Sequence, residues 1–170
     1  MTIGQQWAWK PADKLKSKKE CIHTLAQTVG GDGNLLFNEG PMPDGRIEQR
    51  QVDRLLEMGE WVSANQEAVY GTRGGPFLPS PELVSTHKEQ KIYLYLLKDP
   101  GKKLKLPFVK GFKVKNAYFL QNGQSVSVER KEEELILSLP AGLPDPIASI
   151  VVLELDGPAG EICPLASKTN

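Results

Sequence analysis

The chain has 170 residues, with 21 basic and 21 acidic side chains and 39% apolar residues, which is typical of one or two folded domains. Its zero formal net charge argues against a nucleic-acid partner, because phosphate binding needs a concentrated basic face. No apolar run reaches the roughly 20 residues of a membrane-spanning helix. Cys21 and Cys163 lack CxxC spacing, and only two histidines accompany them. We therefore expect no metal, no cofactor and no membrane association. The first residues do not resemble a signal peptide, and the compartment stays open.

A capping box opens the first predicted helix. Ser17 is followed three residues later by Glu20, so each side chain can satisfy a free backbone N–H. An apolar stripe at helical spacing then follows, formed by Ile22, Leu25, Ala26 and Val29. Gly30 and Gly31 are expected to end the helix because they tolerate the left-handed backbone. His23 lies off the stripe and is expected on the surface.

A short apolar run at residues 34–38 predicts a buried strand. Leu35, Leu36 and Phe37 have no alternating polar partners, which favours a parallel strand covered on both faces. In α/β barrels, active sites lie in the loops at the carboxyl ends of such strands. The predicted strand and loop from Gly33 to Gly45 therefore indicate that the protein is an enzyme.

A turn and a second helix follow the predicted strand. Residues 42–45 fit a type I turn, with proline second and glycine fourth. The second helix is predicted from about Glu48 to Asn65. Its expected apolar face consists of Val52, Leu55, Leu56, Gly59 and Val62. Helix, strand and helix at this spacing are typical of an α/β barrel or a wound sheet.

The pattern changes at residues 71–81, which carry too many prolines and glycines for regular structure. We place a domain boundary in this segment. Beyond it, short β-prone runs occur at residues 91–97, 103–106, 114–121, 125–130, 135–139 and 150–155. Alternation in several of these runs is typical of half-exposed antiparallel strands, and Asn122-Gly123 is a hairpin turn signal. The second part is predicted to be a β-sandwich of six to eight strands, so the fold class is α/β followed by all-β.

Few residues could carry catalysis. Glu39 and Asp44 could form a carboxylate pair at the end of the predicted strand. However, Asp44 is better explained as a turn former, and Glu39 is better explained as a side chain that faces water than as one that faces a pocket. Trp7 and Trp9 could form the apolar wall of a sugar pocket or pack in a core, and their spacing leaves both open. The sequence contains no serine nucleophile elbow, zinc motif, phosphate loop or dinucleotide fingerprint.

Five segments resemble, in order and spacing, consecutive motifs of glycoside hydrolase family 29, the α-L-fucosidases. They are Trp7–Pro11, Gly33–Asn38, Gly40–Ile47, Met58–Trp61 and Glu67–Phe77. The β-rich region that follows is similar to the C-terminal domain of that family. The resemblance implies that residues 1–75 are the last units of a (β/α)₈-like catalytic barrel and residues 76–170 a C-terminal antiparallel β-sandwich.

The resemblance also implies a retaining hydrolase of terminal α-L-fucosides on glycans. Such an enzyme uses an aspartate nucleophile and a glutamate acid/base about 5 to 5.5 Å apart. In the family, both residues and the histidines that hold the fucose hydroxyls belong to earlier barrel strands. We therefore expect no catalytic residue here and no activity of the chain alone.

Two substrate-binding residues carry over from the resemblance. Trp7 is expected near the fucose methyl group, and Asn38 ends the last strand beside the site. Two positions depart from the family pattern: Trp9 replaces the usual tyrosine, and Glu39 replaces a small or apolar residue. Glu39 does not occupy the motif position of the acid/base.

A different hypothesis is a non-catalytic module whose β-sandwich binds carbohydrate or a protein partner. Barrel surfaces that lack the neighbouring strands predict self-association of the isolated chain, or partial disorder in its first 70 residues.

Overall fold

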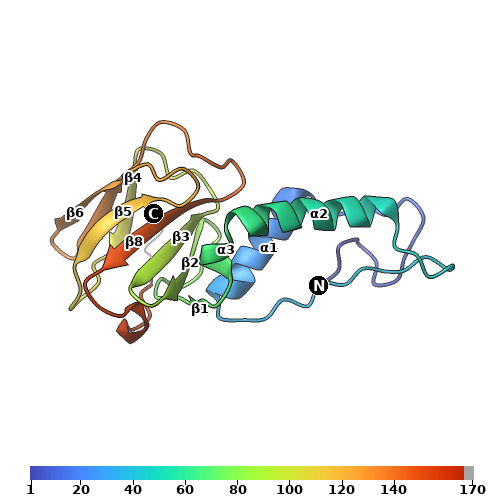
Figure 1. Ribbon diagram of the computed structural model, residues 1–170, viewed down its shortest axis with the longest axis horizontal. Helices are drawn as coiled ribbons and strands as arrows, with labels where there is room; N and C mark the ends of the chain where they lie inside the picture. Colours follow the sequence, from blue (N-terminus) through green and yellow to red (C-terminus); the bar gives the residue numbers. More distant parts are fainter. Residues whose placement is uncertain (167–170) are drawn as a thin grey trace.

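Two antiparallel sheets form the second part of the computed structural model, which describes residues 1–166 (Figure 1). The strands are β1 (Arg73–Gly74), β2 (Leu83–Lys88), β3 (Lys91–Leu96), β4 (Lys103–Pro107), β5 (Val114–Phe119), β6 (Ser127–Lys131), β7 (Glu134–Ser138) and β8 (Ser149–Leu155). One sheet has the order β1-β2-β3-β8-β5 and the other the order β4-β7-β6. β3 to β8 each lie within two residues of their predicted bounds, and the sheets are consistent with the predicted β-sandwich.

The five-stranded sheet is the middle layer of the molecule. One face packs against the three-stranded sheet in a core that includes Phe119 and Leu137. The other face packs against the helices in a second core that includes Ile22, Trp61 and Tyr95. Because both faces are covered, β3 and β8 are buried over nearly their whole length and show no alternation of polar residues.

The first helix, α1 (Lys18–Gly30), confirms the predicted capping box. The Ser17 hydroxyl accepts from the Glu20 backbone N–H at 3.2 Å, and the Glu20 carboxylate accepts from the Ser17 N–H at 2.7 Å. The helix ends where predicted, but the left-handed residue is Asp32, with φ of 59°, not Gly31. Gly30 instead permits close packing, since an added Cβ would lie 2.8 Å from the Cβ of Val84 on β2.

The second helix, α2 (Gln49–Ala64), lies within one residue of its predicted bounds, but its predicted apolar face is only partly correct: Val62 packs against the core beside the sheet, whereas Leu56 and Gly59 are exposed. Leu56 of that face is 62% exposed, whereas Gln51 and Trp61 are buried. The helix is rotated because Trp61 packs against the five-stranded sheet. A single turn, α3 (Gln66–Val69), follows and packs on the same sheet face, as does α1 (Figure 1).

Polar contacts fasten the helices to the loop before β8. The Trp61 indole N–H donates to the Asp145 carboxylate at 2.8 Å. The His23 ring Nε2 lies 2.7 Å from the Ile147 carbonyl oxygen. His23 is therefore half-buried in this interface, which corrects the expectation of a surface histidine.

The buried strand predicted at residues 34–38 is wrong. Asn38 makes a single parallel bridge with Thr2, in which its N–H donates to Met1 O at 2.8 Å and its carbonyl accepts from Ile3 N–H at 3.0 Å. Leu36 is 75% exposed. A buried parallel strand needs neighbours on both sides and on both faces, and in the described residues only the first few lie beside this one. The turn at residues 42–45 is confirmed by a 2.8 Å bond from Gly45 N–H to Met42 O.

The ion pair between Asp32 and Arg73 makes the contact of α1 with β1 dependent on pH. Two Arg73 N–H groups donate to the two Asp32 carboxylate oxygens at 2.8 and 2.6 Å, and Gly74 N–H donates at 3.0 Å. The hydrogen bonds from Arg73, and then from Gly74, lower the pKa of Asp32 from 3.8 to about 2.

Because the folded-state pKa of Asp32 is depressed, its contribution to stability is present above the unfolded pKa of about 3.8 and is lost as the pH falls through about 2. We expect Asp32→Asn to lower Tm near neutral pH and this difference to shrink towards pH 2. Thermal unfolding of both proteins across this range is the measurement. A Tm difference that stays constant with pH would contradict the prediction.

Candidate functional site

The fold brings Trp7 and Asn38 together. The Asn38 side-chain amide donates to the Trp7 carbonyl oxygen at 2.9 Å. The contact uses the main chain of Trp7, so the indole itself is free and is 68% exposed. Asn38 thus supports the backbone that carries the exposed ring.

Asp13 shapes the segment that contains Trp7. One carboxylate oxygen accepts from the backbone N–H groups of Gln5 and Gln6 at 2.9 and 3.2 Å, and the other accepts from Lys14 N–H at 2.9 Å. Desolvation raises the pKa of Asp13, but these three hydrogen bonds outweigh it and lower the pKa overall. The carboxylate therefore closes the loop as a charged group.

Trp9 is held between a loop and a helix. Its indole N–H donates to Glu48 Oε2 at 3.1 Å, and its ring is half-buried. On the other side, the buried Gly40 lies against the same backbone, because an added Cβ would be 2.3 Å from Trp9 N. A larger residue at position 40 would displace the segment that carries Trp7.

Three carboxyl groups of these N-terminal segments have lowered pKa values. A hydrogen bond from Arg46 lowers the pKa of Asp44, and one from Arg50 lowers that of Glu48; Asp13 is described above. A general acid at neutral pH needs a raised pKa. These groups serve as charged acceptors and not as acids, and Asp44 is the turn residue that the sequence indicates.

Sequence reasoning did not single out Asp13 or Glu48. For Asp13 a signal existed: Pro11 is the second residue of the turn closed by the bond from Asp13 N–H to Lys10 O. For Glu48 there was none, because its partner Trp9 lies 39 residues away in the chain.

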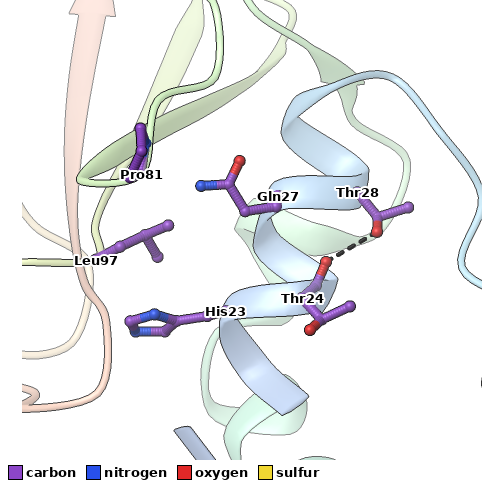
Figure 2. A pocket seen from close by; sticks show the side chains of 6 residues that line it. All are labelled: His23, Thr24, Gln27, Thr28, Pro81 and Leu97. Atoms are coloured by element: carbon purple, nitrogen blue, oxygen red, sulfur yellow. Dashed lines mark hydrogen bonds between the residues drawn. The ribbon is translucent and has the colours of Figure 1, made fainter. Parts of the chain in front are cut away.

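A separate hollow of about 490 Å³ lies between α1 and the ends of the sheet strands (Figure 2). It is lined by His23, Thr24, Gln27, Thr28, Pro81 and Leu97. Its polar groups are largely engaged within the chain, for example Gln27 with Ser80 O at 2.6 Å and Thr28 with Thr24 O at 2.8 Å. Figure 2 shows Gln27 and His23 directed from the helix towards Pro81 and Leu97. The hollow includes neither Trp7 nor Asn38 and offers no acid–base pair.

Residues 1–166 contain neither a candidate metal site nor a candidate membrane-spanning helix. In that range, no three His, Cys, Asp or Glu side chains gather closely enough to hold a metal ion. None of its helices combines the length and the apolar character needed to cross a lipid bilayer.

The N-terminal part of the chain is similar in sequence to known proteins. The sequence model described as α-L-fucosidase matches residues 1–67. Plasma α-L-fucosidase from Homo sapiens is 37% identical over 87 residues, which is 48% of this chain and 19% of that protein. Over its N-terminal part, the chain is therefore similar to the α-L-fucosidases.

Solved α-L-fucosidase structures share the fold of nearly the whole chain. Isoenzyme 1 from Paenibacillus thiaminolyticus has a TM-score of 0.81 and 28% identity, covering 92% of this chain and 39% of that one. The Thermotoga maritima α-fucosidase in complex with fucose has a TM-score of 0.75 and 25% identity, covering 90% of this chain and 38% of that one. The family likeness thus includes both the helices and the sheets, while the chain spans less than two-fifths of these α-L-fucosidases.

Proposed function

We propose that this chain is the C-terminal portion of a retaining α-L-fucosidase that hydrolyses terminal α-L-fucosides of glycans. Residues 1–75 are the last units of its (β/α)₈-like barrel, and residues 76–170 are its β-sandwich domain. The observation that carries the proposal is the joint match of residues 1–67 to the family model and of 92% of the chain to a fucosidase fold. The fucose complex of the Thermotoga maritima relative supports the substrate class.

The N-terminal segments support the barrel assignment. Thr2 and Asn38 form a parallel bridge, and the chain between them includes α1, an arrangement that fits a βαβ unit of a barrel. Side chains beside this pairing are strongly exposed, namely Met1, Trp7 and Leu36. In the proposed whole enzyme, Trp7 stays open to the substrate, whereas Met1 and Leu36 are covered by further strands. In the isolated chain, they favour self-association, which a monodisperse monomer in sedimentation would contradict.

In the proposed site, Trp7 supplies the aromatic wall next to the fucose methyl group. An exposed indole presents a flat apolar face that suits the C–H groups of a sugar. Asn38 holds the Trp7 carbonyl in place. The nucleophile and the acid/base are assigned to the rest of the enzyme because the family resemblance puts both on earlier barrel strands. In addition, the lowered pKa values of Asp13, Asp44 and Glu48 do not suit a general acid.

We expect the isolated chain to give no turnover of an aryl α-L-fucoside above the uncatalysed rate, because it lacks a paired nucleophile and acid/base. The control is the Glu39→Gln variant, whose turnover of the aryl α-L-fucoside should equal that of the unchanged chain. Turnover by the unchanged chain that Glu39→Gln abolishes would contradict the assignment of catalysis elsewhere.

A fusion protein tests whether the chain can serve as the C-terminal portion of an active α-L-fucosidase. The chain replaces the matched C-terminal portion of the Thermotoga maritima enzyme, and α-L-fucosidase activity is measured. We expect activity, and we expect Trp7→Ala in the fusion to lower kcat/KM at least about tenfold. A folded fusion without activity, beside an active unmodified enzyme, would count against the proposal.

The second candidate, a non-catalytic carbohydrate- or protein-binding module, is favoured by the sandwich having a core of its own around Phe119 and Leu137. Against it, the helices cover Tyr95 and Ile150 on the other sheet face, so the sandwich is incomplete without them. The two candidates separate on a fucosylated glycan array. Binding that survives Trp7→Ala favours the module, and binding lost with Trp7→Ala favours the barrel site.

A further inference from the structure

The first residues of α2 contact the Trp7 segment through an acidic side chain. Glu48 is the N-cap of α2, yet its carboxylate makes no capping hydrogen bond to the helix. Residues at this position usually satisfy the free N–H groups of the first turn. The carboxylate instead accepts from the Trp9 indole N–H at 3.1 Å and from Arg50 Nε, and it is only 19% exposed.

Arg50 extends the contact to the other end of the same segment. While Nε donates to Glu48, Nη1 donates to the Asp13 carbonyl oxygen at 3.2 Å. The Asp13 carboxylate in turn holds the N–H groups of Gln5 and Gln6. Glu48 and Arg50, which we call the Glu48–Arg50 clamp, therefore hold residues 5–13 both at Trp9 and at Asp13.

The loop after residue 37 holds the segment independently. Asn38 donates to the Trp7 carbonyl, and Gly40 lies against Trp9 N. The backbone around Trp7 is thus fixed by two elements, whereas the Trp7 ring makes no such contact and is 68% exposed. An exposed ring on a fixed backbone loses little conformational entropy when a ligand stacks on it.

We propose that Glu48 is a positioning residue, which acts with Arg50 to preorganise Trp7 for the apolar face of a sugar. Glu48 itself contacts no ligand. The ordering of Trp7 by Glu48 stands on the contacts above, whereas its consequence for sugar affinity rests on the proposed function of Trp7.

The first test is the motion of Trp7 in the isolated chain, measured by ¹⁵N relaxation at a concentration at which sedimentation shows a monomer. In Glu48→Ala we expect the backbone order parameter of Trp7 to fall from about 0.85 to below about 0.6. The Trp9 indole N–H should also exchange with solvent at least about fivefold faster. Glu60→Ala, which removes an exposed carboxylate of the same helix, is the matched control and should change neither value. An unchanged order parameter at Trp7 in Glu48→Ala overturns the proposal.

A second variant, Trp9→Phe, keeps the proposal testable if Glu48→Ala does not fold. Trp9→Phe keeps the ring but removes the indole N–H, and it should loosen Trp7 as Glu48→Ala does. Glu48→Gln keeps an acceptor but loses the charge opposite Arg50, so its effect should be intermediate. The Trp61 indole resonance, which reports the buried interface with Asp145, should stay in place in each variant. If Glu48→Ala does not fold, an unchanged Trp7 in Trp9→Phe overturns the proposal.

The sugar is tested by titrating L-fucose into the fusion with the Thermotoga maritima barrel, with and without Glu48→Ala. We expect Glu48→Ala to raise the Kd about fivefold. A looser Trp7 with unchanged affinity would overturn the link between order and binding. If Trp7→Ala in the fusion leaves the Kd for fucose unchanged while Glu48→Ala still loosens Trp7, positioning stands and the proposed role of Trp7 in sugar binding fails.

Discussion

Replacing Trp61 by alanine is expected to lower the free energy of unfolding by about 3 to 5 kcal/mol. The side chain is 5% exposed and packs beside Tyr95, with ring centroids 6.4 Å apart. Its removal leaves a cavity between α2 and the five-stranded sheet and deprives the Asp145 carboxylate of a donor. Urea denaturation monitored by circular dichroism measures the change.

The chain provides a matched control for this prediction. Trp7→Ala removes the same side chain from a 68% exposed position, so the free energy of unfolding should change by no more than about 0.5 kcal/mol. Trp61→Phe keeps most of the packing and should cost about 1 to 3 kcal/mol, because Asp145 Oδ2 loses its donor. Equal unfolding midpoints for Trp61→Ala and Trp7→Ala would refute the proposed interface.

Two glycine-to-alanine changes should alter stability in opposite directions. In Gly30→Ala the new Cβ meets Val84 Cβ at 2.8 Å, and this overpacking should cost about 1 to 3 kcal/mol. In Gly59→Ala the Cβ enters open space on α2, so the gain in helix propensity should stabilise the chain by about 0.5 to 1 kcal/mol. Thermal unfolding of the two variants is the measurement. Stabilisation by Gly30→Ala would show that α1 does not pack on β2 as closely as described.

Local signals sufficed to predict the elements whose determinants are local. The capping box of Ser17 and Glu20 lies within one turn, and it fixed the start of α1. The bounds of α2 were equally predictable, but its orientation was not. The periodicity of apolar residues does not show whether the side of α2 that carries Leu56 or the side that carries Trp61 is buried, because both sides carry apolar residues.

Elements that depend on residues distant in the sequence could not be predicted from local sequence signals. β2 was missed because Ser85 and Thr86 appear polar, yet both are fully buried and bond to Phe77 and Ala68. The strand at residues 34–38 was predicted from its apolar content, but a parallel strand exists only with its neighbours. At the candidate site, family motifs gave Trp7 and Asn38, whereas the contact of Glu48 with Trp9 follows only from the fold.

The five-stranded sheet has a mechanical consequence for the proposed border at residues 75 and 76. One face of β3 and β8 belongs to the sandwich core, and the other face is the surface on which α1, α2 and α3 rest. Any sliding of the helices would have to unpack Tyr95 and Ile150 from them. Residues 75 and 76 therefore cannot act as a hinge, and a displacement of the helices would move the strands of the five-stranded sheet with them.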